Sequence, residues 1–213
     1  MTEAEWLAAT DPTPMLSALT PETCLCKSRL LMVACCRRHF SKVVDQECKE
    51  AIEAAERFAD GSEQLQTLTR LRERLPPSDP DDYGIPRAFP AAAFWITHGE
   101  YTQGKQVRFL MEQVVLLMQD AGGRGEQAAQ AALLREIFGN PFRPVAFSAD
   151  WRTDTAITLA RRMYESREFG AMPILADALQ DAGCENDDIL SHCRGDGPHV
   201  RGCWVVDLVL GKE

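Results

Sequence analysis

Apolar residues recur at helical spacing over much of the chain, most clearly between residues 103 and 121. Apolar positions three and four residues apart lie on one face of a helix. In this segment they are Val107, Leu110, Met111, Val114, Val115, Met118 and Ala121. The pattern predicts a long helix that ends at Gly122 and Gly123, because glycine favours helix termini.

The same spacing predicts helices in most of the remaining sequence. They are expected over residues 28–44, 46–59, 62–75, 126–138, 154–166, 172–182 and 186–192. Thr2 and Asp45 are predicted N-caps, since their side-chain oxygens can accept hydrogen bonds from a first helical turn. Near the carboxyl end, Pro198 favours a helix, although residues 204–210 would also suit a strand. The sequence therefore predicts an all-α protein.

One segment interrupts this helical pattern. Residues 76–90 contain five prolines and a glycine. Proline lacks the N–H group that a helix interior needs, so the segment is predicted to be a linker rather than regular helix. It would separate an N-terminal helical part, residues 1–75, from a C-terminal helical part, residues 91–213. These parts are expected to form one compact body or two closely packed halves.

Composition narrows the classes of function. The chain has 213 residues, of which 45% are hydrophobic, enough for a sizeable core. Its 32 acidic and 23 basic residues give a net charge of -9. Because nucleic-acid binding relies on a Lys- and Arg-rich face, this balance argues against a nucleic-acid partner.

The expected location is cytoplasmic. No apolar run approaches the roughly 18 residues of a membrane span. The first residues, Met1 to Trp6, are acidic where a secretory signal would be basic and then apolar. In a reducing compartment, the eight cysteines are expected to be buried thiols or metal ligands rather than disulfides.

The region between residues 184 and 204 concentrates side chains that can bind metals. Zinc binds thiolate and imidazole groups. The candidate ligands are Cys184, His192, Cys193, His199 and Cys203. If the segment from Pro198 is helical, His199 and Cys203 would share one helix face. A close Cys-x-x-Cys pair is lacking, and the alternative is that the three cysteines are small buried hydrophobic residues.

The same region suggests two other kinds of site. Arg194, His199 and Arg201 lie beside a glycine-rich turn and could bind an anion, although Asp196 has the wrong charge. The alternative is that these arginines pair with nearby acidic residues. A further candidate is nucleophilic catalysis by Cys203 with His199, oriented by Asp207. A buried Asp207 would instead meet an arginine, and no catalytic residue is predicted.

Several longer motifs resemble those of an uncharacterised protein family of planctomycete bacteria. They are Ala34-Cys-Cys-Arg-Arg38, Gly139-Asn-Pro-Phe-Arg-Pro-Val145, Pro173-Ile-Leu-Ala-Asp-Ala-Leu179, Ser191-His-Cys-Arg194 and Pro198-His-Val-Arg-Gly-Cys-Trp-Val-Val-Asp-Leu208. The chain departs from the family pattern at Cys24 and Cys26. The resemblance implies a cytoplasmic bacterial setting and brings no activity with it.

These observations favour a non-enzymatic helical module that acts in protein–protein interaction or regulation, with a protein as its partner. Two alternatives remain from the residues themselves. One is a zinc-stabilised domain whose ligands come from the C-terminal cysteines and histidines. The other is a regulator that responds to an anion or nucleotide through residues 194–201.

Overall fold

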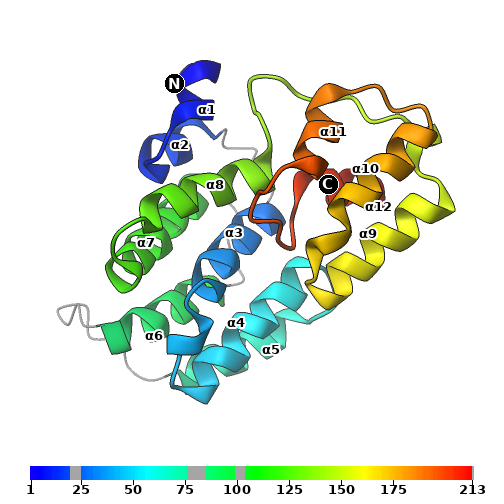
Figure 1. Ribbon diagram of the computed structural model, residues 1–213. Coiled ribbons are helices and arrows are strands. Elements are labelled where there is room, and N and C mark those ends of the chain that lie inside the picture. The colour runs from blue at the N-terminus through cyan, green and yellow to red at the C-terminus, as the bar shows by residue number, and fades with distance from the viewer. Residues whose placement is uncertain (20–24, 76–84, 99–103, 213) are drawn as a thin grey trace. The chain divides into compact units, whose positions relative to one another are not determined.

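The computed structural model describes residues 1–19, 25–75, 85–98 and 104–212 (Figure 1). Every regular element in these ranges is an α-helix or a short 3-10 helix, which confirms the predicted all-α fold. The carboxyl-terminal residues 204–210 are helical rather than extended, as favoured from Pro198. None of the helices in the described ranges has the length and apolarity needed to cross a membrane.

The chain divides into two compact units, Met1–Leu134 (unit 1) and Arg135–Glu213 (unit 2). The helices of unit 1 are α1 (Glu3–Ala8), α2 (Pro12–Ala18), α3 (Leu25–Arg37), α4 (Gln46–Ala59), α5 (Leu65–Arg74), α6 (Ile85–Ile96), α7 (Gly104–Gly122) and most of α8 (Glu126–Phe138). Helix α3 is its central element. Residues 28–36 of α3 are buried, and the helix packs against α4, α6 and α7.

Local signals account well for several helix boundaries. The Thr2 side chain caps α1, and the Asp45 carboxylate accepts a hydrogen bond of 2.9 Å from the Cys48 backbone N–H at the start of α4. Helix α3 ends earlier than expected, at Arg37, and a 3-10 turn over Phe40–Lys42 follows it. The predicted helix to residue 44 was therefore too long, since the chain must become extended before Asp45 can cap α4.

The proline-rich segment differs from the prediction. Residues 76–84 lie outside the described residues, but residues 85–90 begin α6, so the expectation of no regular helix is wrong there. Pro86 is in the first turn, where the missing N–H would have no helical partner, and only Pro90 removes an interior hydrogen bond. Because α6 packs on α3, α4 and α7, the compact units do not follow the predicted division into 1–75 and 91–213.

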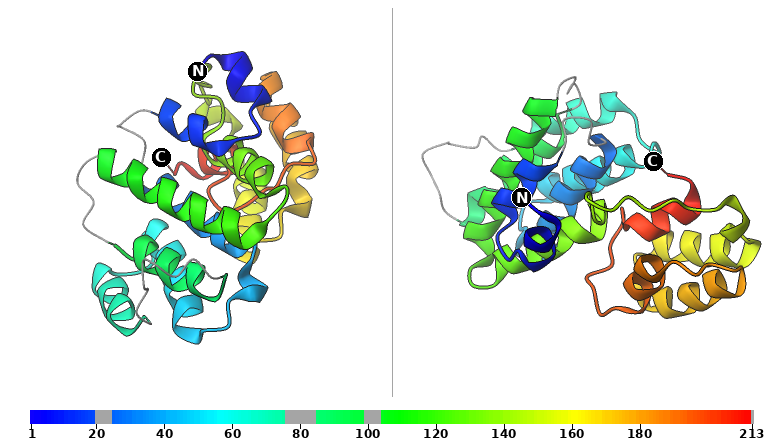
Figure 2. Two further views of the ribbon diagram at one scale, coloured as in Figure 1. Left: turned by 90° about the vertical axis from the view of Figure 1, so that its left-hand side faces the viewer. Right: turned by 90° about the horizontal axis from the view of Figure 1, so that it is seen from above.

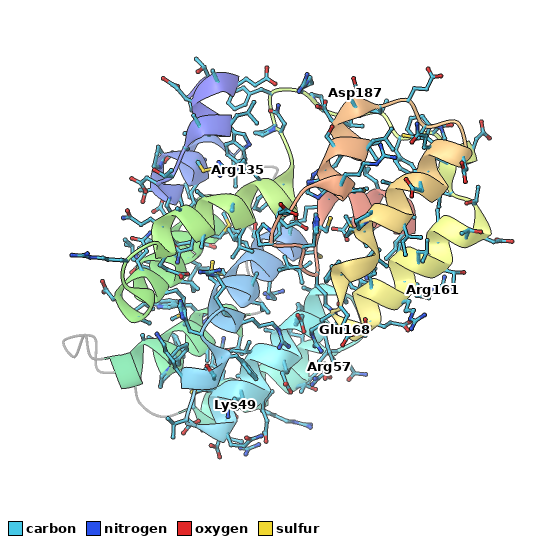
Figure 3. The ribbon with its side chains drawn as sticks, in the orientation of Figure 1. Lys49, Arg57, Arg135, Arg161, Glu168 and Asp187 are labelled. Carbon is cyan, nitrogen blue, oxygen red and sulfur yellow. The ribbon has the colours of Figure 1, made fainter. Side chains whose placement is uncertain are left out.

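Unit 2 is built around one hydrophobic core. After the end of α8, its helices are α9 (Asp154–Ser166), α10 (Met172–Asp181), α11 (Asp187–Arg194) and α12 (Trp204–Leu210), with 3-10 turns at Ala149–Trp151 and Phe169–Ala171. Helix α9 contacts both α10 and α12, and α11 contacts α10. The two views in Figure 2 follow these helices from other sides. Charged side chains such as Arg161, Glu168 and Asp187 are exposed (Figure 3).

The last helix of unit 2 begins later than predicted. Residues 198–203 are not helical, and α12 starts only at Trp204. Gly202 has a φ of 89°, in the left-handed region that suits glycine and ends regular structure. His199 and Cys203 therefore do not share a helix face, and any meeting of their side chains depends on how the loop folds.

Candidate metal centre

Four side chains of unit 2 converge on one point. One ligand atom from each of Glu136, His192, His199 and Cys203 lies within 4.8 Å of the others. Glu136 and Cys203 are buried, and the two histidines are partly buried. The residues come from α8, from α11, and from the loop between α11 and α12, so the cluster joins three separate segments of the chain.

The ends of the surrounding helices position these side chains. Glu136 lies in the last turn of α8, and His192 lies in the last turn of α11, which Asn186 caps at its other end. Gly139 follows α8 with a φ of 65°, and a Cβ atom there would lie 3.3 Å from the Trp204 ring. Glycine at this position thus permits both the turn after α8 and the close approach of Trp204.

The Glu136 carboxylate is the hub of the cluster. Its Oε1 atom lies 3.2 Å from His199 Nδ1 and accepts a hydrogen bond of 3.3 Å from the Val200 backbone N–H. Its Oε2 atom lies 3.3 Å from His192 Nε2. His192 Nε2 is also 3.2 Å from Cys203 Sγ. A carboxylate with these neighbours is buried without being left unsatisfied.

The outer nitrogens of the two imidazoles have different partners. His199 Nε2 lies 3.3 Å from the backbone carbonyl oxygen of Gly195. His192 Nδ1 instead accepts a hydrogen bond of 3.1 Å from the indole Nε1–H of Trp204. One ring therefore faces an acceptor and the other faces a donor, which makes the two histidines chemically distinct.

Burial and the charge of Glu136 shift the pKa values of the two histidines in opposite directions and that of Cys203 in the same direction. Burial lowers the pKa of His192 to about 4, against the pull of Glu136, so its imidazole is neutral. Burial would lower the pKa of His199 too, but the hydrogen bond and charge of Glu136 outweigh it and raise that pKa. Burial, reinforced by Glu136, raises the pKa of the Cys203 thiol well above its ordinary value.

The structure brings together three of the five metal ligands considered from the sequence: His192, His199 and Cys203. The other two, Cys184 and Cys193, lie in the hydrophobic core of unit 2 and outside this cluster. Sequence reasoning missed Glu136. The available signal was its position between the buried residues Leu134 and Ile137 on α8, where a carboxylate needs a polar partner.

The three residues of the predicted anion site each contact other protein groups. Arg194 donates to Asp177 Oδ1 at 2.9 Å and to Gln180 Oε1 at 2.7 Å. Arg201 donates to the backbone carbonyl oxygen of Tyr164 at 2.6 Å. These arginines are thus engaged by residues of different helices, and His199 faces Glu136.

The chemistry of Cys203 also differs from that of a nucleophile. Its sulfur lies 3.2 Å from His192 Nε2, whereas the partner considered from the sequence was His199, whose ligand atom lies within 4.8 Å. Reactive cysteines have a lowered thiol pKa, whereas burial raises the pKa here. Burial therefore disfavours the thiolate form of Cys203. A bound cation would supply a compensating charge and would convert the thiol into a ligand.

Comparisons with known proteins add no functional assignment. No protein-family model matches the chain, and searches of curated proteins and of solved structures found no match. The resemblance to the planctomycete family stays a prediction from its motifs.

Proposed function

We propose that unit 2 is a zinc-binding helical module. The observation that supports this is the convergence of Glu136, His192, His199 and Cys203 on one point. Thiolate, imidazole and carboxylate are the groups that zinc binds in proteins. Zinc–ligand bonds of about 2.0–2.3 Å imply distances of about 3.3–3.8 Å between neighbouring ligand atoms of a tetrahedron. His192 Nε2 lies 3.2 Å from Cys203 Sγ and 3.3 Å from Glu136 Oε2, close to these values. All four ligand atoms lie within 4.8 Å of one another, so the wider pairs would have to move closer to a bound ion.

The surroundings of His199 also suit a ligand. A metal-bound imidazole usually donates its second ring N–H to a carbonyl or carboxylate. If His199 Nδ1 bound the metal, its Nε2–H would point to the Gly195 carbonyl oxygen, 3.3 Å away. The loop backbone thus orients this ring so that Nδ1 faces the cluster. To coordinate zinc, Nδ1 must release the proton that it donates to Glu136.

The number of ligands indicates a structural or regulatory role. Four protein ligands complete a tetrahedral zinc site, whereas catalytic zinc keeps a position open for water or substrate. Zinc would here connect the end of α8 to α11 and to the loop before α12. This role accords with the non-enzymatic module expected from the sequence, and the protein partner of that module stays a prediction.

We expect the full-length protein to bind about one zinc ion per chain, with four protein ligands. Elemental analysis after dialysis and titration against a chromophoric chelator would measure this. Replacing zinc with cobalt(II) should also give the absorption bands of a tetrahedral site with a thiolate ligand. Zinc would hold Cys203 as thiolate despite its raised pKa, because the ion supplies the compensating charge.

Two cysteine variants test which sulfur binds. Cys203→Ala should abolish tight zinc binding and the thiolate band. Cys193→Ala should retain both, because Cys193 is equally buried but lies outside the cluster. Wild-type protein without zinc at micromolar free metal would contradict the proposal, as would loss of zinc from Cys193→Ala together with its retention by Cys203→Ala.

A further inference from the structure

The hydrogen bond from Trp204 determines the tautomer of His192. An indole N–H is only a donor, so the His192 Nδ1 atom that faces it at 3.1 Å must act as an acceptor. In a neutral imidazole the remaining proton is then on Nε2. A doubly protonated ring is excluded because Nδ1 accepts the indole N–H and so carries no proton. Trp204 therefore places a proton on the ring nitrogen that points into the cluster.

That proton has acceptors of its own. His192 Nε2 lies 3.3 Å from Glu136 Oε2 and 3.2 Å from Cys203 Sγ, and both atoms can accept a hydrogen bond. Since Glu136 also contacts His199 and the Val200 N–H, the hydrogen-bonded cluster is internally satisfied. The arrangement is thus a stable alternative to coordination of a metal by the same atoms.

Zinc requires a different tautomer. To bind the metal, His192 Nε2 must present its lone pair, and the proton of the neutral ring must then be on Nδ1. That N–H would face the indole N–H of Trp204, so two donors would meet where the structure now has a hydrogen bond. His199 has no such conflict, because its outer nitrogen faces a carbonyl oxygen.

We propose that Trp204 lowers the zinc affinity of this site by holding His192 in the tautomer that cannot coordinate the metal. This inference rests on the proposed zinc-binding function and concerns its regulation. Zinc and the Trp204–His192 hydrogen bond exclude one another, so coordination requires the indole to release His192. Trp204 packs over Gly139 and begins α12, so release of the indole changes the contact between the end of α8 and the start of α12.

Trp204→Phe tests the inference directly. Phenylalanine keeps an aromatic ring over Gly139 but has no N–H to hold His192. We expect zinc to bind about tenfold more tightly, the factor that corresponds to one hydrogen bond lost from the competing form. Chelator competition on the full-length protein measures the change. Trp151→Phe is the matched control, because Trp151 is also a partly buried tryptophan of unit 2, packs on Phe147 and is not a member of the cluster.

The wild-type protein gives a second, independent measurement. Nitrogen-15 nuclear magnetic resonance of chelator-treated protein should show His192 protonated at Nε2. Addition of zinc should move the proton to Nδ1 and shift the Trp204 indole resonance. An Nδ1–H tautomer in the chelator-treated protein would overturn the inference even if Trp204→Phe failed to fold.

Failure of zinc binding and failure of the proposed role of Trp204 would give different results. If wild-type protein does not bind zinc, the proposed function falls and this inference falls with it. If wild-type protein binds zinc but folded Trp204→Phe binds it equally or more weakly, zinc binding stands and the role of Trp204 is refuted. An equal increase in zinc affinity in Trp151→Phe would also refute it, because the effect would then not depend on the hydrogen bond to His192.

Discussion

Removal of residues 198–213 is expected to unfold the helices of unit 2. The deleted segment includes α12, whose side chains Val205, Val206 and Val209 are all buried in the core of that unit. Burial of such a side chain contributes about 1.5–3 kcal/mol. The three together are comparable to the whole net stability of a typical domain, about 5–15 kcal/mol. The truncation also removes His199 and Cys203, which are two of the four side chains in the cluster around Glu136 (the Glu136 cluster).

Hydrogen exchange followed by mass spectrometry can locate this loss. Peptides from α9, α10 and α11 should exchange rapidly in the truncated chain and slowly in the full chain. A chain that ends at Gly211 is the control, since it keeps α12 and its left-handed glycine cap. Unchanged protection in the chain lacking residues 198–213 would mean that the tail is not part of the core and serves another purpose.

Glu136→Ala should destabilise the protein by about 3 kcal/mol in the presence of a chelator. Glu136 is only 2% exposed, and its carboxylate is the shared acceptor for His199 and the Val200 N–H. Loss of one member of a buried ion pair typically costs about 3–5 kcal/mol. We expect the lower end of that range because His199 can release its proton once its partner is absent.

Urea unfolding followed by circular dichroism measures the change in free energy. Glu185→Ala is the control, since Glu185 is an exposed residue of the same unit and its loss should stay within about 0.5 kcal/mol. Without the chelator, Glu136→Ala should also fail to gain stability from added zinc, whereas the Glu185 variant should gain as much as the wild type. Equal stability of the two variants in chelator would show that the Glu136 cluster does not hold unit 2 together.

The sequence by itself determined most of the helices. Helical spacing together with Asp45 predicted α4 at residues 46–59, and α8 and α9 have the bounds that the apolar pattern indicated. These features depend on residues a few positions apart, so the local pattern contains them. The same kind of reasoning selected His192, His199 and Cys203 as candidate metal ligands, because they are concentrated within one short stretch.

Tertiary structure decided what depends on distant residues. Glu136 lies 63 residues before His199, and only the folding of the loop after α11 against the end of α8 brings them together. Packing on α3, α4 and α7 likewise makes residues 85–90 part of a helix that their prolines disfavour locally. The tautomer of His192 follows from the position of Trp204, which in turn needs the space left by Gly139. Sequence periodicity and spacing indicate which residues belong to the same helix. A hydrogen bond or a metal site between helices depends instead on atoms that folding brings to about 3 Å from one another.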